Sequence, residues 1–83
     1  MKRFLTSIER FFSTYDLSLT ERGVSVPRSN KAAIEKLKTL AATYVKLTRV
    51  PVYIKCQNTI NEFLAMLQTY HAKNKGDEQP NNS

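Results

Sequence analysis

Apolar residues at helical intervals restrict the fold of this chain more than any other feature. In the segment 2–15 they are spaced three or four positions apart, at Phe4, Leu5, Ile8, Phe11, Phe12 and Tyr15. Such spacing places side chains on one face of an α-helix. An interfacial membrane helix would show the same face. The same face could also be partly exposed and dock onto a partner protein. However, it is a large share of the apolar surface that 83 residues can bury, which favours packing into the chain's own core. We therefore predict a helix that packs into the core.

A second helix is predicted over residues 31–46. Its apolar positions also recur at helical spacing: Ile34, Leu37, Leu40, Ala41, Tyr44 and Val45. Ser29 or Asn30 can cap its start, since both side chains accept hydrogen bonds from backbone N–H groups. The intervening residues 16–30 contain Gly23 and Pro27 and are predicted to form a long connection.

The third segment has two interpretations. As a helix it shows spacing of three and four at Tyr53, Cys56, Ile60, Phe63, Leu67 and Tyr70. Thr48 would then be the N-cap, and Pro51 would lie in the first turn, where its missing N–H costs little. As a strand, Val50, Val52, Ile54 and Cys56 would alternate inward, with Arg49, Tyr53 and Lys55 facing outward. A fresh helix would then start at Thr59, which has capping-box spacing to Glu62.

We favour the helical interpretation because a strand here has little to pair with. The short alternating stretch "GVSV" is its one evident partner, and an isolated two-stranded pair is weak. The predicted fold is mainly α, a small bundle of three helices with a long first connection. The alternative is an α+β fold that pairs residues 23–27 with 50–55. Residues 1–72 would form the single domain and 73–83 a flexible polar tail. A homodimer would add buried area and is kept open.

The residues that catalysis or metal binding needs are scarce. The two glycines, Gly23 and Gly76, stand alone and form no phosphate-binding loop. One cysteine and one histidine cannot build an ordinary zinc site within one chain. Cys56 lies among apolar residues and is expected to be a buried thiol, whereas His71 is expected to be solvated. We predict no catalytic residues, no metal and no cofactor.

The cellular environment is inferred from the same composition. A single cysteine provides no internal disulfide, which suits a reducing compartment. No run approaches the roughly 18 apolar residues of a membrane span. We expect a cytoplasmic protein without a membrane span.

Positive charge is concentrated in the middle of the chain. The formal net charge is +6, and residues 22–55 hold eight Lys and Arg residues against one acid, Glu35. Clustered cations favour contact with phosphates. The predicted nucleic-acid-binding residues are Arg22, Arg28, Lys31, Lys38, Lys46, Arg49, Tyr53 and Lys55.

Part of this region, "LAATYVKLTRVPVYIK", resembles the helix-turn-helix motif over sixteen residues, although it lacks the turn glycine. The resemblance implies a turn at Lys46 and Leu47 and a recognition helix capped by Thr48. Arg49, Tyr53 and Lys55 would then face phosphates or base edges.

Two functions follow as hypotheses. The first is a small non-enzymatic regulatory or accessory protein that contacts nucleic acid or a nucleoprotein complex through its basic surface. The alternative is a protein-binding adaptor or inhibitor that covers an acidic protein surface, or a homo-oligomeric structural module. Both require the central cations to share one exposed face.

Overall fold

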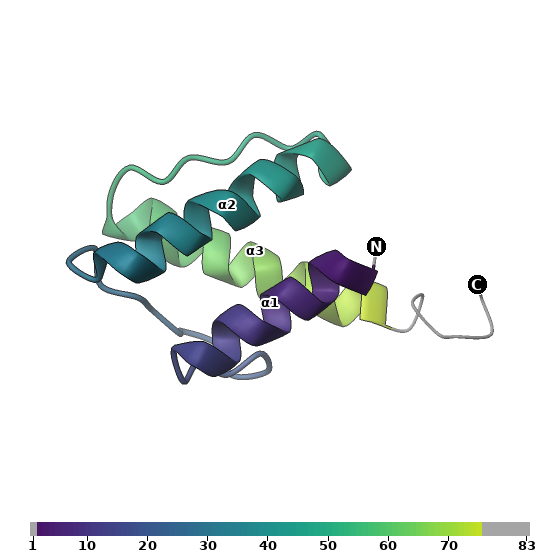
Figure 1. The fold of residues 1–83 in the computed structure, drawn as a ribbon, viewed down its shortest axis with the longest axis horizontal. Coiled ribbons are helices and arrows are strands. Elements are labelled where there is room, and N and C mark those ends of the chain that lie inside the picture. Colours follow the sequence, from purple (N-terminus) through teal and green to yellow (C-terminus); the bar gives the residue numbers. More distant parts are fainter. Residues whose placement is uncertain (1, 76–83) are drawn as a thin grey trace.

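The computed structural model describes residues 2–75 and contains three helices (Figure 1). They are α1 (Lys2–Thr14), α2 (Lys31–Thr48) and α3 (Gln57–Lys75). The mainly α, three-helix prediction is confirmed. The alternative pairing of 23–27 with 50–55 is wrong, since residues 2–75 include no strand. Helix α3 extends three residues into the range assigned to the tail, and positions 76–83 lie outside the described residues.

Helices α2 and α3 run in the same direction along the long axis of the molecule, and α1 runs the opposite way (Figure 1). The chain must therefore return along the length of α2 before α3 can begin. Residues 49–56, here named the crossover, make this return beside α2.

The crossover is too short to be helical, because its eight residues must span the length of α2. Helix α2 has 18 residues and is about 27 Å long at 1.5 Å per residue. Eight residues cover roughly 26 Å when extended at about 3.3 Å each. The prediction that a helix starts at Thr48 is wrong for this reason: a helical crossover would reach less than half of that distance.

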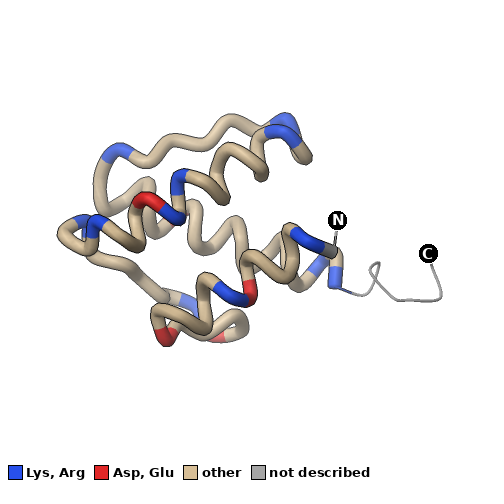
Figure 2. Tube along the Cα trace, viewed as in Figure 1, with Lys and Arg blue, Asp and Glu red and all other residues tan. Residues whose placement is uncertain are grey.

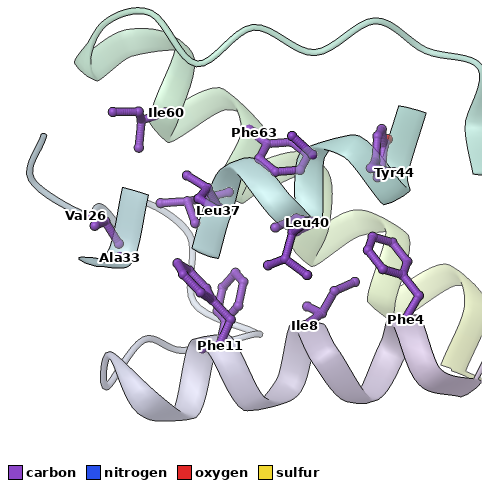
Figure 3. Packing of buried hydrophobic residues seen from close by; sticks show 14 of the residues in the cluster. Phe4, Ile8, Phe11, Val26, Ala33, Leu37, Leu40, Tyr44, Ile60 and Phe63 are labelled. Carbon is purple, nitrogen blue, oxygen red and sulfur yellow. The ribbon is translucent and has the colours of Figure 1, made fainter. Parts of the chain in front are cut away.

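The apolar face of α1 lies in the core, as predicted. Its buried side chains are Phe4, Leu5, Ile8, Phe11 and Phe12. Figure 3 shows Phe11 and Ile8 pointing toward Leu37 and Leu40 of α2. The opposite side of the core comes from α3, whose buried apolar residues are Ile60, Phe63, Leu64 and Leu67. None of the helices in the described residues 2–75 combines the length and the apolar character that a membrane span requires.

Aromatic rings close the core at the end where α1 begins and α2 and α3 terminate. The Tyr44 ring lies 5.5 Å from Phe63 and 5.6 Å from Tyr70, edge to face in both cases. Phe4 contacts Tyr70 at 5.4 Å between ring centroids. Such pairs stabilise a fold beyond the area that they bury.

Both ends of α2 and the start of α3 are capped, by side chains at the two starts and by the backbone at the end of α2. Asn30, one of the two residues predicted as the N-cap of α2, is its N-cap: its Oδ1 accepts a hydrogen bond from the Ala33 N–H at 3.2 Å. At the other end Arg49 adopts a left-handed conformation (φ 63°, ψ 18°) and its N–H donates to the Val45 carbonyl. Helix α3 begins at Gln57 rather than at Thr59. The Thr59 hydroxyl instead reaches back and accepts the N–H of the two residues that precede α3.

Two glutamines of α3 hold the long 16–30 connection against the bundle. Gln68 Nε2 donates to the carbonyls of Ser18 and Glu21 at 2.7 and 2.8 Å. Gln57 Nε2 donates to the carbonyl of Val26 at 2.8 Å, and the Val26 side chain is buried. Side-chain amides therefore take the place of the strand pairing considered for this segment.

The prediction of a solvated His71 is wrong. Its side chain is buried and its Nε2 lies 2.7 Å from Oε2 of Glu9. This contact links the last turns of α3 to α1, across 62 positions of sequence.

Candidate nucleic-acid interface

Seven of the eight residues predicted to contact nucleic acid follow α2, its N-terminal turn and the crossover. We name this set the basic ridge: Arg28, Lys31, Lys38, Lys46, Arg49, Tyr53 and Lys55. All seven side chains are exposed. Figure 2 shows Lys and Arg along α2 and at both ends of the crossover. The ridge therefore extends over the full length of α2.

Three lysines form a row on the exposed face of α2. Lys31, Lys38 and Lys46 are seven and eight positions apart, close to two helical turns in each case. Successive members of the row are thus about 10–12 Å apart along the helix axis. The core-facing residues of α2, among them Leu37, occupy the opposite side.

The crossover brings further cations to both ends of this row. Arg49 directly follows α2, one turn beyond Lys46. At the far end the Arg28 backbone N–H donates to Gln57 Oε1 at 3.2 Å. This bond places the turn before α2 beside the start of α3, two residues after Lys55.

Side chains alternate along the crossover. Val52 and Ile54 are half-buried and line a shallow hollow with Ala41 and Val45 of α2. Tyr53, between them, is 58% exposed. The alternation considered in the strand interpretation is therefore present at these positions. It arises from packing against a helix, without a partner strand.

The backbone of the crossover carries free hydrogen-bonding groups. Within residues 2–75, no backbone N–H or C=O of Val52, Tyr53 or Ile54 has an intrachain hydrogen-bond partner. The crossover N–H groups of Val50, Lys55 and Cys56 do have partners, which are threonine hydroxyls. The unpaired stretch thus coincides with the position of the exposed tyrosine.

Tyr53 also contacts a cation of the ridge. Lys55 Nζ lies 5.0 Å from the centroid of the Tyr53 ring, within the range of a cation–π interaction. An aromatic ring and an ammonium group are therefore presented together at the surface of the crossover.

Within the described residues, two acidic side chains lie near the ridge: Glu35 of α2, and Glu62 of α3, which lines a small hollow with Tyr53. Glu35 is the one acid in positions 22–55, and its Oε2 lies 4.0 Å from Lys38 Nζ. Both side chains are more than half exposed, so this ion pair contributes little.

Arg22 is apart from the ridge. It lines a hollow with Gly23, Ala65 and Gln68, where the first connection crosses α3. Lys36, the remaining cation of residues 22–55, lies on the side of α2 that faces α1, in a hollow that Arg10 also lines. The structure thus brings together most of the predicted residues and leaves Arg22 elsewhere.

The helix-turn-helix interpretation is wrong. Thr48 is the last residue of α2 and not the cap of a new helix. Its hydroxyl donates to the Tyr44 carbonyl at 2.8 Å and accepts the Val50 N–H at 3.1 Å. Arg49, Tyr53 and Lys55 accordingly lie on an irregular segment, and no recognition helix carries them.

The prediction of a buried Cys56 thiol is also wrong, because this residue is exposed at the start of α3. The backbone N–H and the hydroxyl of Thr59 lower the pKa of the Cys56 thiol, and the charge of Arg28 adds to this effect. Of its apolar neighbours in sequence, Ile60 and Phe63 are buried within α3, whereas Cys56 precedes that helix. Within residues 2–75, no three His, Cys, Asp or Glu side chains are grouped closely enough to hold a metal ion.

Searches of protein-family models, of curated protein sequences and of solved structures return no match to this chain.

Proposed function

We propose that this protein is a nucleic-acid-binding accessory protein whose basic ridge contacts the phosphate backbone. The observation that carries the proposal is the gathering of six exposed cations on α2 and its flanking segments. Among the described residues, two acids lie nearby: the weakly paired Glu35, and Glu62 in the hollow beside Tyr53. Neutralising phosphates releases condensed counterions, which drives binding without reading sequence. A row of cations about 10–12 Å apart can contact several phosphates of one backbone at once.

The proposal is tested by measuring affinity against salt concentration for two double variants. Lys46→Gln with Lys55→Gln removes two ridge charges, and Arg3→Gln with Arg22→Gln removes two exposed charges outside the ridge. Each phosphate contact contributes about −0.9 to the slope of log affinity against log salt for duplex DNA and about −0.7 for single strands. The ridge variant should therefore lose between about 1.4 and 1.8 of slope and bind several-fold more weakly at low salt.

The matched control should keep nearly the full slope, because it has the same net charge as the ridge variant. Equal losses in the two variants would show that net charge alone governs binding. Absence of binding to any oligonucleotide at low salt would refute the proposal.

A second candidate is docking onto an acidic protein surface. It is favoured by Leu47 and Val50, large apolar residues that are exposed beside the cations of the ridge. Capture of host partners before and after nuclease treatment separates the two functions. Partners lost on nuclease treatment support the first candidate, and an acidic protein that is retained supports the second.

A further inference from the structure

We infer that the basic ridge prefers unpaired, single-stranded nucleic acid and that the crossover binds its bases, with Tyr53 as the stacking residue. This inference rests on the proposed function and specifies its ligand. It is drawn from the shape of the ridge, from the exposure of Tyr53 and from the unpaired backbone around that residue.

The shape of the ridge disfavours reading of a duplex. The major groove of B-DNA is about 12 Å wide, which one helix with its side chains already fills. Along α2, Val52 and Ile54 of the crossover lie against one flank. Phe11 and Arg10 of α1 lie near the other flank. A helix with its side chains already fills the groove, so the crossover packed along α2 disfavours insertion of α2 into a duplex.

Tyr53 has the properties of a base-stacking residue. Single-strand-binding proteins combine a basic track for the backbone with exposed aromatic rings on which bases stack. Tyr53 is the most exposed of the large apolar residues described, at 58%, and it lies between the cations of Arg49 and Lys55. Its ring lies outside the core cluster and lines a small hollow with Thr59, Glu62 and Met66 of α3. Lys55 Nζ approaches the ring centroid at 5.0 Å.

The backbone at this position adds hydrogen-bonding capacity. The N–H and C=O groups of Val52, Tyr53 and Ile54 lack intrachain partners within the described residues. Unstacked bases present donors and acceptors on their edges, whereas a duplex has already paired its Watson–Crick edges. A single strand lying along the ridge can therefore place phosphates near the lysine row and bases over the crossover.

The test compares three probes of about twelve nucleotides, a length within the range of single-strand site sizes. They are oligo-dT, an abasic strand with the same number of phosphates, and a mixed-sequence duplex. Binding of the full chain is followed by fluorescence anisotropy at low salt. The variants are Tyr53→Ala, Tyr53→Phe and Tyr53→Leu, with Val50→Ala as the control in the same segment.

Oligo-dT should bind more tightly than the abasic strand and the duplex. Tyr53→Ala should weaken oligo-dT binding by roughly 5- to 150-fold, the range that corresponds to loss of one base–aromatic stack. The same substitution should change abasic and duplex binding less than about two-fold, since phosphate contacts do not require the ring. Tyr53→Phe should retain binding, Tyr53→Leu should not, and Val50→Ala should have little effect.

The outcomes separate this inference from the proposed function. If all three probes bind equally and Tyr53→Ala changes none of them, the single-strand inference is overturned while phosphate binding stands. If no probe binds, both are overturned. If an acidic peptide such as polyglutamate binds as tightly as oligo-dT and is equally weakened by Tyr53→Ala, the crossover is a protein-docking site and the inference is again overturned.

Discussion

Replacing Thr59 with valine tests the capping of α3 with little change in shape. The Thr59 hydroxyl accepts the N–H of Lys55 at 2.9 Å and that of Cys56 at 3.0 Å. It also donates to the Cys56 carbonyl at 2.9 Å. Valine cannot make these bonds. Because both donor residues are exposed, water can replace part of the loss. We expect a destabilisation of about 1 kcal/mol, the typical value for loss of a cap.

For a domain of this size, a loss of about 1 kcal/mol corresponds to a decrease of roughly 4–8 °C in Tm. Thermal and urea denaturation followed by far-UV circular dichroism measure it. Thr39→Val is the matched control, since the Thr39 hydroxyl donates to the Glu35 carbonyl within α2 and caps nothing. The control should lie within about 0.5 kcal/mol of the wild type. Equal decreases in the two variants would refute the capping role of Thr59.

Three further predictions concern the C-cap residue Arg49, the Gln68 side chain that holds the 16–30 connection, and the Cys56 thiol. Arg49→Gly should raise the free energy of unfolding by up to about 1 kcal/mol, because glycine adopts the left-handed C-cap conformation of this residue without strain. Urea titrations measure this change, and a lower urea concentration at the unfolding midpoint would contradict it. Gln68→Ala should destabilise the fold by about 1–2 kcal/mol, because the carbonyls of Ser18 and Glu21 lose their donor, and hydrogen exchange should become faster in the 16–30 connection than in the core. Unchanged exchange in the connection would show that the Gln68 amide does not hold it in place. The rate of Cys56 alkylation should rise at a lower pH than for an ordinary thiol, because the lowered pKa of Cys56 gives thiolate at lower pH, and Thr59→Val should shift this pH profile to higher pH. Identical pH profiles in the wild type and the variant would show that the Thr59 hydroxyl does not lower the pKa of Cys56.

The first two helices could be predicted from sequence because their information is local. Steps of three and four in the apolar residues of α1 correspond to buried positions, including Ile8 and Phe12. Asn30 was predictable as one of two N-cap residues for the same reason. Neither inference needed knowledge of the rest of the fold.

The crossover could not be predicted, because its conformation depends on the direction of α3. Period-two alternation at Val52 and Ile54 shows that one side of a segment is buried, whether it packs on a strand or on a helix. The helical spacing that begins at Tyr53 runs across two different elements, because Tyr53 and Cys56 lie in the crossover and the later residues lie in α3. The parallel orientation of α2 and α3 requires an extended return between them, and no local pattern encodes that orientation.

The candidate site was predictable in part. Charge counting found the cations that form the ridge, but it could not show that Arg22 lies on another part of the surface. The buried state of His71 was missed because its partner, Glu9, is far away in sequence. The unpaired backbone beside Tyr53 has no signature in sequence, because it depends on the absence of a neighbouring strand.

Mapping bound nucleic acid by NMR tests the basic ridge most directly. Backbone amide shifts of the labelled full chain would be followed during titration with oligo-dT at low and then at moderate salt. The account predicts that the largest shift changes fall on the lysine row of α2 and on the crossover around Tyr53, and that they fade as salt rises. Changes centred on the Arg22 hollow or on α1, or shifts that do not respond to salt, would contradict it.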